Sequence, residues 1–134
     1  MSRGRILVVD DRPTNLKLAA EVLVAAGYDV QRAADAEEAV DVLQRTPIDL
    51  ILMDISMPGM DGLELTRLLK GDESTRQVCI VALTALALKG DDQKALDAGC
   101  DGYIAKPLDT RKLPLQVAEF LRWKAEGKAP PWVF

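Results

Sequence analysis

The sequence predicts an α/β domain in which helices cover both faces of a parallel β-sheet. Five short apolar runs recur at regular intervals along the chain, and stretches with helical periodicity separate them. The 134 residues suffice for one compact domain, and 49% hydrophobic with 28% charged residues is the composition of a folded protein. We therefore expect a single α/β unit.

The predicted strands are the five apolar runs, at residues 5–10, 29–33, 48–54, 78–84 and 102–107. The first, third and fourth runs are apolar almost throughout, which is typical of central strands buried on both faces. The second run contains Asp29, Gln31 and Arg32 and therefore belongs at an edge of the sheet. With right-handed crossovers, these features predict the strand order 2-1-3-4-5.

The predicted helices occupy the remaining segments, at residues 13–26, 36–45, 62–71, 87–98 and 109–125. Pro13 suits the first turn of the first helix. Helical periodicity stops at Gly127, and two prolines farther on preclude a regular helix there. We expect one domain over residues 1–124 and a C-terminal tail over residues 125–134.

Composition narrows the possible functions. The formal net charge is −4 and basic residues are scattered, which argues against nucleic-acid binding. The N-terminal apolar run is too short for a secretory signal or a membrane span, so we expect a cytoplasmic protein. The chain has no histidine, which excludes histidine-dependent triads. Cys79 and Cys100 lack the spacing of a metal site, and we expect buried thiols.

Polar side chains stand at the carboxyl ends of four predicted strands, where open parallel sheets bind ligands. The first strand leads into Asp10 and Asp11, the third ends at Asp54, the fourth ends at Thr84, and the fifth carries Lys106. Three carboxylates and one ammonium leave two negative charges, which one divalent cation would neutralise. Mg²⁺ suits such an oxygen-lined site, and Mn²⁺ should substitute.

A phosphoryl group fits the same site. The Thr84 hydroxyl and the Lys106 ammonium could contact phosphoryl oxygens, and a carboxylate such as Asp54 can act as a nucleophile and form an aspartyl phosphate. Simpler interpretations exist for each residue. Asp10 and Asp11 could cap the first helix, and we expect capping to be part of their role. Thr84 could be an ordinary strand residue, and Lys106 a solvated lysine.

The motifs "ILVVDD", "LILMDISMPGMDG", "VALTA" and "YIAKP", in this order, resemble those of bacterial two-component response regulator receiver domains. The resemblance covers roughly residues 4–124 and implies a flavodoxin-like receiver fold with five helices. It also implies that Asp54 is the phosphoacceptor and that Asp11 is a direct Mg²⁺ ligand. Asp10 would act on the metal mainly through water, and the carbonyl of Ser56 would supply a further ligand.

The same resemblance implies a switch. Thr84 would be the switch hydroxyl and Lys106 the phosphate-binding lysine, followed by a cis peptide bond to Pro107. Tyr103 matches the aromatic switch position of the family, although one aromatic residue in a short strand is more often a packing residue.

Within the family, the chain is most similar to stand-alone cell-cycle regulators and to receivers of diguanylate cyclases. This similarity implies a signalling switch without DNA-binding output, not a turnover enzyme. Its phosphodonor would be a sensor histidine kinase or a histidine phosphotransfer protein, and its output a contact with a downstream signalling protein. We expect a monomer or weak dimer, no nucleic acid and no membrane. A receiver fragment of a larger regulator would look the same.

Two other classes of protein are possible. A phosphohydrolase of the haloacid dehalogenase type also uses an aspartate nucleophile, but Asp54 is followed by Ile55 and Ser56, so the second acid of that motif is missing. A structural module that has kept only the fold is the other alternative, and the complete set of acids and lysine argues against it. No glycine-rich GK[ST] loop is present.

Overall fold

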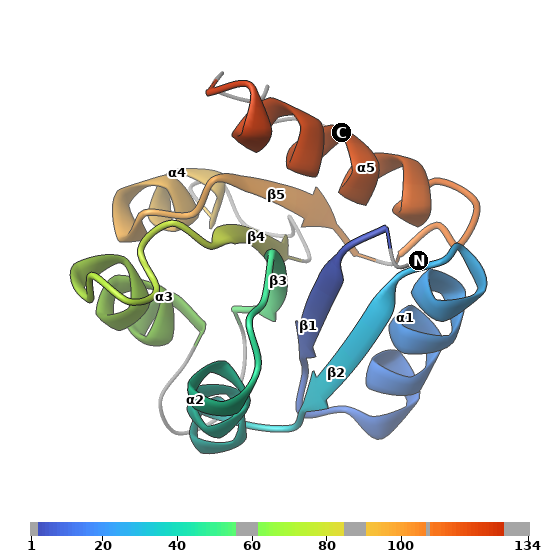
Figure 1. Cartoon of the computed structure of the whole chain (residues 1–134), viewed down its shortest axis with the longest axis horizontal. Coiled ribbons are helices and arrows are strands. Elements are labelled where there is room, and N and C mark those ends of the chain that lie inside the picture. Colours follow the sequence, from blue (N-terminus) through green and yellow to red (C-terminus); the bar gives the residue numbers. More distant parts are fainter. Residues whose placement is uncertain (1–2, 56–61, 85–90, 107, 128–134) are drawn as a thin grey trace.

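A computed structural model of the chain describes residues 3–55, 62–84, 91–106 and 108–127. Five strands form one parallel sheet in the order β2-β1-β3-β4-β5, and a helix follows each strand (Figure 1). The predicted strand order and the edge position of the second strand are confirmed. The elements are β1 (Arg5–Val9), α1 (Pro13–Ala25), β2 (Asp29–Ala33), α2 (Ala36–Arg45), β3 (Leu50–Asp54), α3 (Gly62–Gly71), β4 (Cys79–Thr84), α4 (Asp91–Ala98), β5 (Gly102–Ala105) and α5 (Leu113–Ala125).

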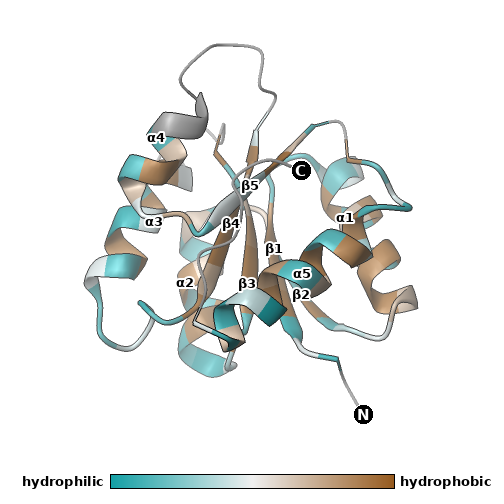
Figure 2. Ribbon diagram, turned by 90° about the horizontal axis from the view of Figure 1, so that it is seen from above, coloured by the Kyte–Doolittle hydropathy of each residue, from teal (hydrophilic) through white to brown (hydrophobic). Residues whose placement is uncertain are grey.

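The helices form two layers, with α1 and α5 on one face of the sheet and α2, α3 and α4 on the other (Figure 1). Figure 2 shows hydrophobic strands at the centre and many hydrophilic residues on the helices around them. Because side chains alternate between the faces of a strand, Ile6 and Val8 pack toward α1 and α5, whereas Leu7 and Val9 pack in the opposite cluster. Burying both faces of β3 explains its continuous apolar sequence.

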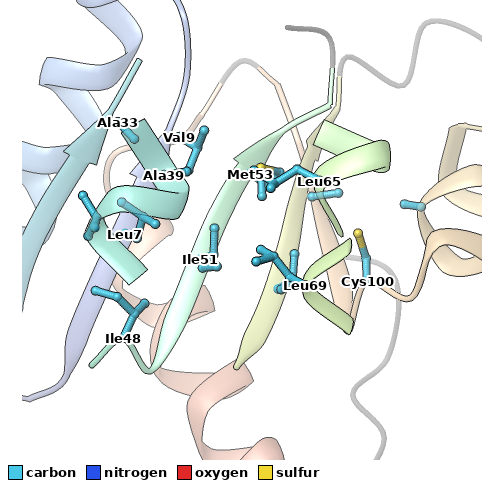
Figure 3. Close-up of a cluster of buried hydrophobic side chains, with 14 of the residues drawn as sticks. Leu7, Val9, Ala33, Ala39, Ile48, Ile51, Met53, Leu65, Leu69 and Cys100 are labelled. Atoms are coloured by element: carbon cyan, nitrogen blue, oxygen red, sulfur yellow. The ribbon is translucent and has the colours of Figure 1, made fainter. Parts of the chain in front are cut away.

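The cluster beneath α2, α3 and α4 fixes how those helices lie on the sheet (Figure 3). Met53 of β3 lies beside Leu65 of α3, and Cys100 lies near Leu69. Cys79 and Cys100 are both buried and form no disulfide, as expected. Within the described residues, no helix is both long and apolar enough to cross a membrane.

Two helix boundaries differ from the predicted ones or go beyond the described residues. The last helix begins at Leu113 and not at residue 109. The Asp109 carboxylate accepts the N–H of Arg111 at 2.9 Å, which makes a turn of residues that periodicity alone assigned to the helix. The predicted helix 87–98 is described from Asp91 onward, and residues 87–90 lie outside the described part of the chain.

Candidate functional site

Three carboxylates meet at the carboxyl edge of the sheet. Val9 of β1 is paired with Met53 of β3, so Asp10 and Asp54 follow in neighbouring strands. One carboxylate oxygen from each of Asp10, Asp11 and Asp54 lies within 4.8 Å of the other two. Parallel pairing thus brings together acids that are more than 40 residues apart in the sequence.

Lys106 supplies the positive charge of this edge. Its Nζ lies 3.2 Å from Asp54 Oδ2 and 3.6 Å from Asp10 Oδ2. The backbone N–H of Lys106 donates to the carbonyl of Thr84 at 2.7 Å, which continues the pairing of β4 and β5 beyond the end of β5. The lysine is thereby held by the same backbone that carries Thr84.

Both Asp10 and Asp54 are almost completely buried, with side chains 2% and 3% exposed. Burial raises the pKa of the Asp10 carboxyl because it penalises the ionised form. The Arg12 N–H and the Lys106 charge act in the opposite direction, the Asp54 carboxylate raises the pKa of Asp10 as well, and the net direction is upward. The Arg12 N–H and the Lys106 charge therefore only partly offset the cost of burying the ionised Asp10 carboxylate.

The capping role expected of Asp10 and Asp11 is wrong. The residue that precedes α1 is Arg12, and no side chain caps the helix. Asp10 Oδ1 accepts the N–H of Arg12 at 2.9 Å. Because Arg12 precedes α1, this bond does not satisfy a free N–H group of the first helical turn. This bond orients the Asp10 carboxylate within the site.

Of the other predicted residues, Thr84 stands at the same carboxyl edge, Tyr103 packs beneath one face of the sheet, and Ser56 and Pro107 are not described by the structure. Thr84 ends β4 and is buried, 1% exposed, beside the backbone of Lys106. Tyr103 is 5% exposed and packs in the cluster beneath α2, α3 and α4. Ser56 and Pro107, the predicted metal-ligand carbonyl and cis-proline, lie outside the described residues.

The donor set fits a small divalent cation. The three carboxylates offer hard oxygen ligands within a few ångströms of one another, and the described residues at this edge contribute no thiolate or imidazole. With Lys106 counted, two negative charges remain, which one Mg²⁺ would balance. Asp10, Asp11 and Asp54 are the side chains that would hold it.

Sequence reasoning did not single out Gly62, the first residue of α3. An alanine at this position would place its Cβ 2.3 Å from the carbonyl oxygen of Asp54. The only sequence signal was a glycine at the start of a predicted helix, eight positions after the acid.

Comparisons with known proteins agree with this geometry. Residues 6–118 match the response regulator receiver domain family. The chain is 37% identical over 116 residues to the polar-differentiation response regulator DivK of Brucella ovis, a match that covers 87% of the chain and 94% of that protein.

Solved structures show the same fold. A CheY-like receiver domain protein from Methanospirillum hungatei superposes with a TM-score of 0.84 at 31% identity, covering 94% of this chain and 99% of that one. A putative two-component system response regulator/GGDEF domain protein superposes with a TM-score of 0.86 at 28% identity, covering 92% of this chain and 51% of that one. The chain belongs to the response regulator receiver domain family, the signalling modules of two-component systems.

Proposed function

We propose that the protein is a phosphorylation-dependent signalling switch in which Asp54 accepts a phosphoryl group from a phosphohistidine of a partner protein. The observation that carries the proposal is the position of the Asp54 carboxylate. It is buried at the end of a rigid central strand, 3.2 Å from the Lys106 ammonium and beside the carboxylates of Asp10 and Asp11.

In the transfer, an Asp54 carboxylate oxygen forms a bond to phosphorus. The bond between phosphorus and the imidazole nitrogen of the partner breaks, and that nitrogen leaves with the electron pair of the bond. The phosphoryl group brings negative charge to a site that already holds three carboxylates, so Lys106 is placed to contact a phosphoryl oxygen. When bound by Asp10, Asp11 and Asp54, Mg²⁺ would supply the remaining charge neutralisation.

Phosphorylation of Asp54 would alter the protein surface by way of Thr84 and Tyr103. The Thr84 hydroxyl would contact the phosphoryl group, and Tyr103, whose side chain is buried, would be held in that inward position. Both residues lie on strands that adjoin α4 and α5, so this region would present the state to a downstream signalling protein. A switch of this kind needs only a few kcal/mol of differential interaction.

The test uses Mg²⁺ with acetyl phosphate as a small phosphodonor. We expect intact-protein mass spectrometry to show one added phosphoryl group on the wild type and none on Asp54→Asn. Asp49→Asn, which alters an acid near the other end of β3 whose carboxylate accepts the Arg5 N–H, should be phosphorylated like the wild type.

A wild type that gains no such mass would contradict the proposal. Sustained release of phosphate from many small phosphomonoesters, without accumulation of the labelled protein, would instead identify a phosphohydrolase.

A further inference from the structure

We infer that Gly62 is a positioning residue for Asp54, because α3 can rest against the backbone of the phosphoacceptor only if its first residue has no side chain. The inference rests on the proposed function and concerns the same site. It assigns a role in the reaction to a residue that contacts neither metal nor phosphodonor.

The contact is with backbone atoms, which cannot move aside as the end of a side chain can. A Cβ at position 62 would lie 2.3 Å from the carbonyl oxygen of Asp54 and 2.8 Å from the Cα of Ile55. It would also lie 2.9 Å from Cγ of Met53. Ordinary contacts of a Cβ begin near 3.4 Å, so one methyl group requires a displacement of about 1 Å.

Other contacts prevent α3 from absorbing this displacement alone. Leu65, one turn along α3, is fully buried and lies beside Met53 in the same cluster (Figure 3). The Thr66 hydroxyl donates to the carbonyl of Gly62 at 2.7 Å, and the thiol of Cys100 lies 3.8 Å from that hydroxyl oxygen. The Thr66–Gly62 bond stiffens the first turn of α3 from within, and Leu65 and the Thr66–Cys100 contact hold that turn in place, so part of the strain passes to the end of β3.

The partners of Asp54 stand on other strands and would not follow such a shift. Lys106 comes after β5, and Asp10 comes after β1. A movement of the Asp54 backbone therefore changes the distances from its carboxylate to the lysine and to the other acids. An error of about 1 Å in the placement of a reacting group can reduce a rate about a hundredfold.

The experiment compares phosphorylation rates with acetyl phosphate at saturating Mg²⁺. We expect Gly62→Ala to be phosphorylated about 10- to 100-fold more slowly than the wild type. Gly71→Ala is the matched control, since it makes the same change at the other end of α3, where a Cβ meets nothing within 4 Å, and should keep the wild-type rate.

A second control separates positioning from loss of stability. Val117→Ala removes buried atoms of α5 on the opposite face of the sheet and lowers the urea midpoint, but should leave the rate of the folded protein unchanged. If Gly62→Ala does not fold, Thr66→Val takes its place, because it removes the hydroxyl that binds Gly62 without changing side-chain size. It should slow the reaction about threefold or more.

Several results would overturn the inference. One is a wild-type rate in Gly62→Ala, or in Thr66→Val if only that variant folds, and another is an equal loss in Gly71→Ala or Val117→Ala. These outcomes differ from failure of the proposed function, in which the wild type itself takes up no phosphoryl group.

Discussion

Lys106 and Asp54 form an ion pair of 3.2 Å between residues that follow β5 and end β3, two strands that β4 separates. The lysine side chain therefore reaches over the end of β4, past Thr84, to the phosphoacceptor proposed above. The same ammonium lies 3.6 Å from Oδ2 of Asp10, so one lysine is close to carboxylates at the ends of two strands.

Replacing this cation should destabilise the protein. Lys106→Met leaves the buried carboxylates of Asp10 and Asp54 without the ammonium that pairs with both, and we expect the free energy of unfolding to fall by about 1–3 kcal/mol in urea titrations without divalent cations. Saturating Mg²⁺ should reduce the difference. Lys17→Met, which breaks only an exposed pair with Glu21, should change stability by less than about 0.5 kcal/mol. Equal losses of stability in the two variants would contradict the role of Lys106 as the charge partner of Asp10 and Asp54.

Asp10→Asn should stabilise the metal-free protein at neutral pH. Burial raises the pKa of Asp10 in the folded state, so the folded protein binds a proton more readily than the unfolded chain and loses stability as pH rises through that pKa. Asparagine avoids this cost and can still accept the Arg12 N–H. Thermal melts across pH should show a higher Tm for Asp10→Asn at neutral pH and a smaller difference in acid.

Asp109→Asn provides the opposite case for the same chemical change. The backbone N–H of Arg111 lowers the pKa of Asp109, so its ionised form favours the folded state above the ordinary carboxyl pKa and this contribution is lost as pH falls. We expect a slightly lower Tm at neutral pH. If both variants shift Tm in the same direction at neutral pH, the opposite pKa shifts of Asp10 and Asp109 are contradicted.

The two thiols should resist modification in the folded protein. Burial raises the pKa of Cys79 to about 12 and that of Cys100 to about 11, so the reactive thiolate is scarce at pH 8 and sterically shielded. A thiol-reactive chromogenic disulfide should label both cysteines within minutes in urea and very slowly without it. Ala25→Cys adds an exposed thiol and should react at once. Rapid native labelling of the wild type would refute the prediction.

Asp101 should matter for stability and not for phosphorylation. Its carboxylate accepts the N–H of Ile80 at 2.8 Å and pairs with Lys70 at 2.8 Å and Lys124 at 3.2 Å, joining β4, α3 and α5 at the amino end of β5. Asp101→Ala should cost about 2–4 kcal/mol in urea, and Asp101→Asn less. Both should take up a phosphoryl group at the wild-type rate, in contrast to Asp54→Asn. A matching loss of phosphorylation would show that this network controls the site.

The sequence predicted the sheet order and the meeting of Asp10, Asp11, Asp54 and Lys106, because apolar runs and strand ends are local signals. The turn at Asp109 was missed because the Asp109 side chain binds the backbone N–H of Arg111 and so replaces the start of the helix, while the spacing of apolar residues still looks helical. The closeness of Gly62 to Asp54 and the three partners of Asp101 arise only from tertiary packing. Spacing along the chain carries no information about either.

The sheet separates two hydrophobic clusters, one beneath α1 and α5 and the other beneath α2, α3 and α4. The strands set the positions of the charged residues at their ends, and the outward sides of the helices contribute little to either cluster. Those outward residues can therefore be exchanged at little cost to the core. Under the switch proposed above, exchanging them for those of another receiver should change the partner that is contacted while the strand-end residues stay in place.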